Sequence, residues 1–118
     1  MNISPENQND PNRDRFVLSK GHVAEALETV LADRGFIDPA ELQTFQALGS
    51  RLIGHPNNKV EGVEMNSGAL GHGLSVCVGM AIAGKMQNMP YRVYTVMGDG
   101  ELAEGSIWEA VECAAQYK

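Results

Sequence analysis

A Gly-Asp-Gly tripeptide at residues 98–100 follows a short apolar run, and this order suits phosphate chemistry. Residues 93–97 (VYTVM) are apolar, aromatic or β-branched without alternation, which predicts a strand buried on both faces of a parallel sheet. Open α/β sheets bind ligands at the carboxyl ends of their strands. Asp99 offers the hard carboxylate oxygen that Mg²⁺ prefers beside phosphate oxygens, and Gly100 lets the backbone approach a ligand closely. The tripeptide therefore predicts a site for a metal-bridged phosphate.

The same tripeptide has a purely structural interpretation, because Gly and Asp are common residues of tight turns. In that interpretation, Asp99 only caps the helix predicted over residues 102–117. Glu101 and Glu104 follow at the head of this helix, where negative charge is favourable. On local grounds these two glutamates need no catalytic role.

A second glycine-rich segment, Gly68-x-x-Gly71-x-Gly73, precedes another predicted helix. It is not the dinucleotide fingerprint, since the spacing is reversed and no strand precedes it. Its backbone N–H groups could hold an anion at the helix start, or its glycines could serve tight packing alone. The sequence leaves both interpretations open.

Three histidines lie beside glycines at predicted loop ends, namely His22, His55 and His72. They lack the His-x-x-x-His spacing of a zinc site. Phosphate contact or proton transfer is therefore the functional hypothesis, and a structural role in the loops is its alternative.

The remaining pattern predicts an α/β fold. Residues 1–14 are polar and predict a tail or linker without a core, and residues 15–18 predict an extended piece. A helix with apolar positions at helical spacing is expected from residue 19, with a left-handed stop at Gly35. Asp38 predicts a second helix over residues 38–49 as its cap, with Pro39 first and Glu41 completing a capping box.

The second half of the chain is predicted to hold a loop, a buried helix and the strand described above. Residues 50–67 lack periodicity and predict a long loop. Residues 68–89 are apolar nearly all round, which predicts a buried, tightly packed helix. A single clear strand does not make a sheet, so the domain is expected to be incomplete.

Composition excludes several classes of function. The 118 residues suffice for one small domain, and the net charge of −6 argues against nucleic-acid binding. No apolar run has the length of a membrane span, and the N-terminus has no signal-peptide core. Cys77 and Cys113 lie in apolar contexts without metal spacing, which predicts buried free thiols in a reducing cytoplasm.

Four collinear blocks together resemble transketolase in its diphosphate-binding half. They are DRFVLSKGH, LGSRLIGHP, GVEMNSGALGHGLSVCVGMAIA and YRVYTVMGDGELAEGSIWEA. The blocks cover roughly residues 14–118, and several motifs in one order are far more specific than any single motif. The resemblance implies a thiamine-diphosphate-binding fold, a parallel sheet flanked by helices, over residues 15–118.

The resemblance also implies a cofactor site. Asp99 would be a ligand of the divalent ion, Mg²⁺ or Ca²⁺, that holds the diphosphate of thiamine diphosphate. Gly100 would pack against that diphosphate, and His22 would contact it. Gly68 and Leu70 would lie along the cofactor.

Two further residues match catalytic positions of the family. His55 matches a histidine that contacts the substrate near its reacting carbonyl. Glu104 matches a glutamate that links the two cofactor sites of the dimer. In the family the cofactor carries the hard chemistry, the transfer of a two-carbon ketol unit between sugar phosphates.

The sequence also departs from the family pattern. The stretch expected before DRFVLS, the asparagine metal ligand expected after the Gly-Asp-Gly motif, and the pyrimidine-binding domain are all absent, and His72 replaces a common glutamine. We therefore expect a domain truncated at both ends that is inactive alone and need not bind the cofactor by itself. It is expected to need a complementary transketolase chain or to form a homo-oligomer. The alternative is a non-enzymatic interaction module that retains part of the fold.

Overall fold

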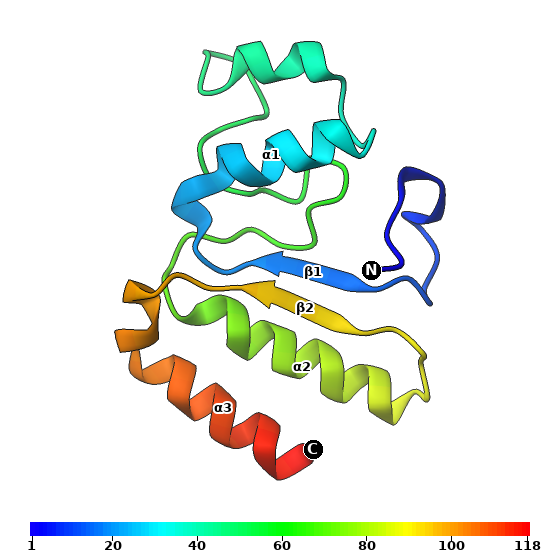
Figure 1. The fold of residues 1–118 in the computed structure, drawn as a ribbon, viewed down its shortest axis with the longest axis vertical. Helices are drawn as coiled ribbons and strands as arrows, with labels where there is room; N and C mark the ends of the chain where they lie inside the picture. Colours follow the sequence, from blue (N-terminus) through cyan, green and yellow to red (C-terminus); the bar gives the residue numbers. More distant parts are fainter.

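Two short parallel strands with helices on either side make up the fold (Figure 1). The computed structural model describes residues 1–118. The elements, with η for a 3₁₀-helix, are η1 (Pro5–Asn7), β1 (Arg15–Leu18), η2 (Gly21–Val23), α1 (Ala24–Asp33), η3 (Pro39–Thr44), α2 (His72–Met86), β2 (Val93–Val96), η4 (Gly100–Ala103) and α3 (Gly105–Tyr117).

The two strands pair in parallel, with Arg15 opposite Val93 and Leu18 opposite Val96. Parallel strands need a long crossover, and here it runs through α1, a long loop and α2. Figure 1 shows α1 beside β1, and α2 beside β2 with α3 beyond it. The predicted α/β class with a parallel sheet and flanking helices is confirmed.

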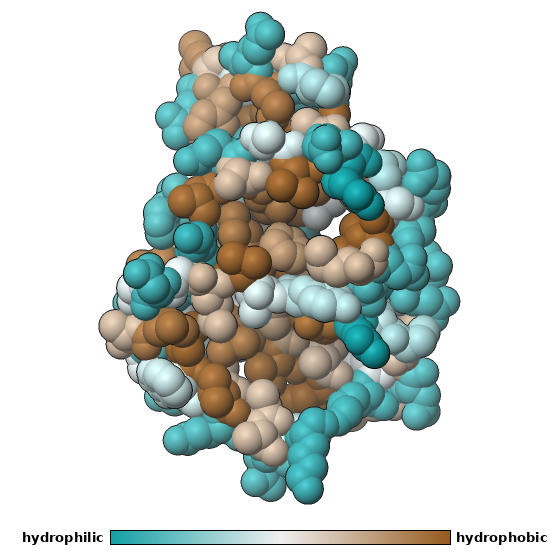
Figure 2. All heavy atoms as spheres, viewed as in Figure 1, coloured by the Kyte–Doolittle hydropathy of each residue, from teal (hydrophilic) through white to brown (hydrophobic).

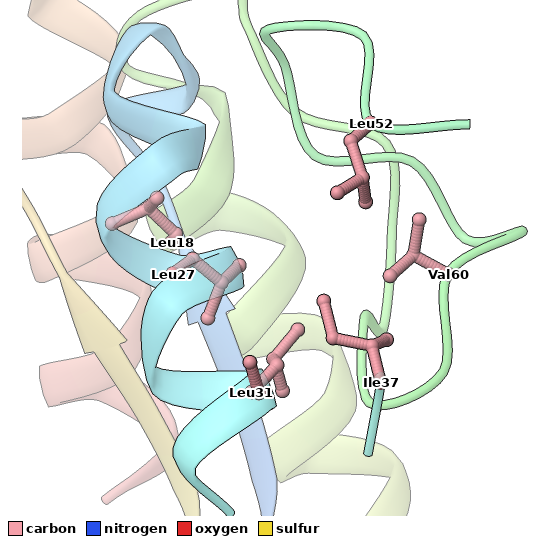
Figure 3. Packing of buried hydrophobic residues seen from close by; sticks show 7 residues of the cluster. Leu18, Leu27, Leu31, Ile37, Leu52 and Val60 are labelled. Carbon is pink, nitrogen blue, oxygen red and sulfur yellow. The ribbon is translucent and has the colours of Figure 1, made fainter. Parts of the chain in front are cut away.

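The apolar core joins β1, α1 and the loop that follows (Figure 3). Its buried members are Leu18, Leu27, Leu31, Ala32, Ile37, Leu52 and Val60. The chain turns back onto this core at Gly35, whose φ of +81° lies in the left-handed region. The Phe36 N–H donates to the Leu31 carbonyl at 2.9 Å, so the predicted left-handed stop of the helix is confirmed.

The prediction that the glycine-rich helix is buried is wrong. Only Gly73, Cys77 and Gly84 of α2 are buried, because β2 and α3 cover just part of its circumference. The strand β2 likewise is not buried on both faces, and Val96 is 46% exposed. On the face of the molecule drawn in Figure 2, brown apolar surface covers the region where the sheet, α2 and α3 lie.

The helix predicted over residues 38–49 is shorter than expected. Asp38 does cap it, accepting a bond from the Ala40 N–H at 2.9 Å. However, the element is a 3₁₀-helix that ends at Thr44. The Glu41 carboxylate does not complete a capping box, because it binds the Arg51 guanidinium instead.

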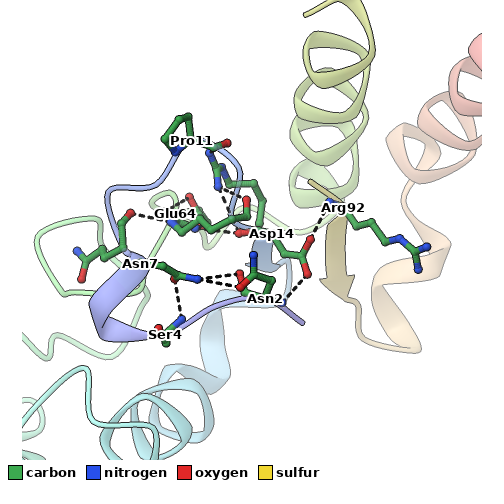
Figure 4. A network of polar contacts seen from close by, with 10 residues as sticks. Asn2, Ser4, Asn7, Pro11, Asp14, Glu64 and Arg92 are labelled. Atoms are coloured by element: carbon green, nitrogen blue, oxygen red, sulfur yellow. Dashed lines mark hydrogen bonds and ion pairs between the residues drawn. The ribbon is translucent and has the colours of Figure 1, made fainter. Parts of the chain in front are cut away.

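Residues 1–14 fold back onto the domain through polar contacts (Figure 4). Asp14 is buried and accepts bonds from the backbone N–H groups of Asn2 and Arg92, at 2.6 and 2.8 Å. These bonds lower the pKa of the Asp14 carboxyl, and Arg13 forms an ion pair with Glu64. The contacts attach the segment, while a domain boundary at residue 14 stays a prediction.

Both cysteines are free, with Cys77 buried and Cys113 half-buried. Burial raises the pKa of the Cys77 thiol, which keeps it protonated and unreactive. None of the helices combines the length and apolar character that a membrane crossing requires.

Candidate functional site

The carboxyl ends of the two strands meet at one edge of the fold. Both arrows in Figure 1 point to this edge, where η2 and η4 lie close to the strand ends. The Ser19 N–H donates to the Val96 carbonyl at 3.0 Å, which continues the pairing beyond β1. The segments after the two strands, residues 19–22 and 98–101, are therefore brought together although they are far apart in the sequence.

The glycine-rich segment of residues 67–73 packs directly against the end of β1. A Cβ on Gly21 would lie 2.7 Å from the Gly68 nitrogen, and one on Gly73 would lie 2.6 Å from the Ser19 Cα. Both distances are too short for a side chain, so glycine allows the backbones this close approach. Tight packing explains at least part of this motif.

Gly71 attaches the same segment to the start of α3. Its φ is +83°, and a Cβ there would lie 2.8 Å from the Glu104 Cβ. Its carbonyl accepts a bond from the Ser106 hydroxyl at 3.0 Å. Glu104 is exposed and lies beside the glycine-rich segment that also carries Gly68 and Leu70.

A buried carboxylate, Glu101, lies where these segments meet. It is 2% exposed, and its Oε1 accepts bonds from the Ser19 hydroxyl at 2.5 Å and the Gly71 N–H at 2.8 Å. Its Oε2 accepts a bond from the Gly98 N–H at 3.1 Å. The sequence analysis missed this role, since a glutamate at a helix start carries no local sign that distant donors surround it.

Two opposing effects act on the pKa of Glu101. Burial raises it, but hydrogen bonds from Ser19, Gly71 and Gly98, with the charge of nearby His22, lower it more. The pKa therefore lies below the ordinary glutamate value, and the buried group stays ionised at neutral pH.

Asp99 immediately precedes η4, in the N-cap position, but its side chain makes no capping hydrogen bond. The structure thus contradicts the capping alternative for this residue. Asp99 and Gly100 are both exposed at the edge. Nothing lies within 4 Å of a Cβ placed on Gly100, so there is room beside its backbone.

The histidines differ in their surroundings. His22 lies in η2 and is exposed, and it is close enough to Glu101 to affect its pKa. The His55 ring lies against Gly68, where a Cβ would come 3.0 Å from its Cδ2. His72 is exposed, and its Nδ1 lies 3.2 Å from the Leu70 carbonyl.

The chain contains no group of three or more His, Cys, Asp or Glu side chains placed to hold a metal ion. A Mg²⁺ ion often uses only one or two carboxylates and takes its other ligands from phosphate and water. Asp99, with an uncapped and exposed carboxylate, fits one such ligand. The residues present are therefore compatible with a metal that arrives together with a diphosphate.

We call the edge where the carboxyl ends of β1 and β2 meet the strand-end edge. The fold and the loops gathered at this edge define the class of the protein as a parallel α/β domain that binds a cofactor. The family model described as "Transketolase, thiamine diphosphate binding domain" matches residues 1–118. The chain therefore belongs to the transketolase thiamine-diphosphate-binding domain family, and the resemblance seen in the sequence is confirmed.

Three known proteins show the extent of this similarity. One is a subunit of the apulose-4-phosphate transketolase of Phocaeicola vulgatus, 52% identical over 100% of this chain and 42% of that one. The chain is 45% identical to the Homo sapiens transketolase over 100% of this chain and 19% of that one. The crystal structure of Campylobacter jejuni transketolase matches with a TM-score of 0.88 and 35% identity, covering 100% of this chain and 20% of that one. The chain thus spans less than half the length of these relatives.

Proposed function

We propose that this chain binds the diphosphate of thiamine diphosphate, through Mg²⁺ or Ca²⁺, at the edge formed by the carboxyl ends of β1 and β2. The observation that carries the proposal is the convergence of residues 19–22, 67–73 and 98–101 at this edge. Ligands of open α/β sheets bind at such edges, and the description of the matching family names thiamine diphosphate.

Each residue would have a distinct part in holding the cofactor. Asp99 would hold the divalent ion, the Gly100 backbone would lie against the diphosphate, and the His22 imidazole would donate a hydrogen bond to it. Gly68 and Leu70 would lie along the cofactor. The exposure of Asp99 and Gly100 supports these assignments.

His55 and Glu104 would take part in the reaction. When bound, the cofactor supplies the carbon nucleophile for moving a two-carbon ketol unit between sugar phosphates. The His55 ring, held against Gly68, would bind the substrate beside its reacting carbonyl. Glu104, next to Gly71, would link this site to the second cofactor site of an assembled dimer.

The chain would act as one part of a two-chain enzyme. The 52% identical relative bears the name of one lettered subunit of a transketolase, and such a name implies a complementary chain for that protein. We propose the same for this chain, with the pyrimidine-binding part of the site supplied by the partner.

Replacing Asp99 by Ala tests the cofactor site. Titration of wild type with thiamine diphosphate and Mg²⁺ should show binding in the millimolar range at best. Each missing contact group typically removes about 1–3 kcal/mol, or roughly five- to 150-fold in affinity. Asp99→Ala, or omission of Mg²⁺, should abolish this binding, while Asp33→Ala, which changes an exposed aspartate at the end of α1, should not.

Binding that ignores both the metal and Asp99 would contradict the proposal. The circular dichroism spectrum of Asp99→Ala should match wild type, because Asp99 is exposed and makes no cap bond. Unfolding of this variant would instead show that the residue has a structural role.

A second candidate function is an interaction module without catalysis. It is favoured by the apolar residues exposed on α2 and α3, among them Val76, Met86, Trp108 and Val111. Exposed apolar patches of more than a few hundred Å² usually mark an interface. The same titration separates the two candidates, since an interaction module would bind no cofactor.

A further inference from the structure

Two glutamates of this chain are equally buried but differ in their hydrogen bonds. Glu28 on α1 and Glu101 on η4 are each 2% exposed. The Oε2 of Glu28 has no hydrogen-bond partner. Glu101, by contrast, accepts three hydrogen bonds, each from a different segment. This difference indicates that Glu101 has a specific task at the strand-end edge.

The three donors belong to the three segments that carry the candidate cofactor residues. Ser19 lies three positions before His22, Gly71 directly follows Leu70, and Gly98 directly precedes Asp99. One side chain therefore connects the loop after β1, the glycine-rich segment and the loop after β2. Such a connection sets the relative position of groups that no continuous helix or strand holds together.

The arrangement requires a side chain that only accepts hydrogen bonds. Ser19, Gly71 and Gly98 are all buried, so water cannot replace a lost acceptor. A glutamine amide has one oxygen and one NH₂ group. Whichever way the amide turns, its NH₂ group faces the N–H of either Gly71 or Gly98, and that N–H loses its acceptor.

We propose that Glu101 is a positioning residue that holds these three loops in the arrangement that binds the diphosphate. Glu101 is 2% exposed, and both of its oxygens accept bonds within the protein, so it is placed to hold the loops and not to contact the ligand. It acts through the loops that carry His22, Leu70 and Asp99. This inference rests on the proposed cofactor site. It adds to that site a residue to which the resemblance to transketolase assigned no role.

The test is Glu101→Gln in the full chain, followed by nuclear magnetic resonance of the backbone amides. Titration with thiamine diphosphate and Mg²⁺ measures millimolar affinities directly through the shifts of the Asp99 and Gly100 amides and the His22 ring. We expect the dissociation constant to rise by roughly five- to 150-fold, the range for one buried donor left without its acceptor. The amide protons of Gly71 and Gly98 should also exchange faster with solvent.

Glu28→Gln is the matched control, because it makes the same change at an equally buried carboxylate on another element. Its dissociation constant should equal that of wild type. The measurement is made well below the unfolding midpoint of each variant. A purely structural role for Glu101 would then lower the melting temperature and leave the dissociation constant unchanged, which would overturn the inference.

If Glu101→Gln does not fold, Ser19→Ala decides the question. This variant removes one donor and leaves the two glycine N–H bonds to Glu101 in place. It should weaken binding measurably but less than the glutamine variant is expected to, and unchanged binding would overturn the inference. If the wild-type chain binds no cofactor, the proposed function itself is overturned. If the wild-type chain binds the cofactor and the variants bind it equally well, only the positioning role of Glu101 is overturned.

Discussion

At the scale of single residues, the surroundings of each buried carboxyl decide its charge. Glu101 has donors on both oxygens, and its pKa is lowered despite burial. Burial raises the pKa of Glu28, and the neighbouring Glu25 and Glu41 raise it further. Glu101 thus stays ionised where the two strands end, whereas Glu28, the same residue type on α1, resists ionisation.

The buried carboxyl of Glu28 is expected to destabilise the chain at neutral pH. The pKa of Glu28 in the folded state lies above its pKa in the unfolded state. At pH values below the unfolded-state pKa, the carboxyl is protonated in both states and costs no stability. As pH rises through the folded-state pKa, the free energy of unfolding falls. Glu28→Gln removes the charge that burial disfavours, so it should increase the free energy of unfolding at pH 7 more than it does at pH 4. Urea unfolding at pH 4 and pH 7 measures this, with exposed Glu109→Gln as control. Equal gains at both pH values would contradict the expectation.

At the scale of elements, α2 carries glycines of two kinds. A Cβ on Gly73 would lie 2.6 Å from the Ser19 Cα, whereas a Cβ on Gly79 would meet nothing within 4 Å. The first glycine lets the helix start approach the end of β1. The second serves no contact within this chain and only lowers helix propensity.

Alanine substitutions at these glycines should therefore have opposite effects. Gly73→Ala should destabilise the chain by about 1–3 kcal/mol, because the new methyl group meets backbone that cannot yield easily. Gly79→Ala should stabilise it by about 0.5–1 kcal/mol. Thermal unfolding of the two variants beside wild type provides the measurement. A destabilised Gly79→Ala would show that this face of α2 is covered, as in an association of chains.

At the scale of the whole molecule, the chain is flat and leaves much apolar surface open. Its principal extents are 44 × 33 × 19 Å. An apolar cavity of about 530 Å³ lies on the α1 side of the sheet, lined by Met1, Phe16 and Val30 among others, and contains none of the candidate site residues. Both strands also have an unpaired outer edge. Two strands alone rarely form a stable sheet, so this surface favours association.

We expect the pure chain to self-associate in the absence of a partner. Light scattering at micromolar concentration should give a mass above that of the 12.7 kDa monomer. The apolar residues exposed on α2 and α3 supply the driving force. A uniform monomer at this and higher concentrations would argue against the expectation.

We also expect no ketol transfer by the pure chain. The proposed function places the pyrimidine-binding part of the site on a partner, and no group of side chains here holds a metal by itself. An assay with a ketose phosphate donor and an aldose phosphate acceptor should show only background. Activity that persists after removal of host transketolase would refute the two-chain proposal.

The sequence by itself determined the local features of this protein. The apolar run at residues 93–97 predicts β2, the spacing of Leu27 and Leu31 predicts α1, and Gly35 predicts its left-handed stop. These predictions succeed because they depend on backbone preferences and periodicity over a few residues. The motifs with Asp99 and His22 likewise carried the family assignment without any structure.

Only the tertiary structure decided which groups are buried and what meets them. Residues 15–18 had no assigned partner in the sequence analysis, and the structure pairs them with β2 in parallel. The helix predicted to be buried is largely exposed, because burial depends on how many elements surround it. Glu101 is an acceptor for Ser19, a residue 82 positions away. No local pattern encodes such a contact, since it depends on where the crossover returns the chain.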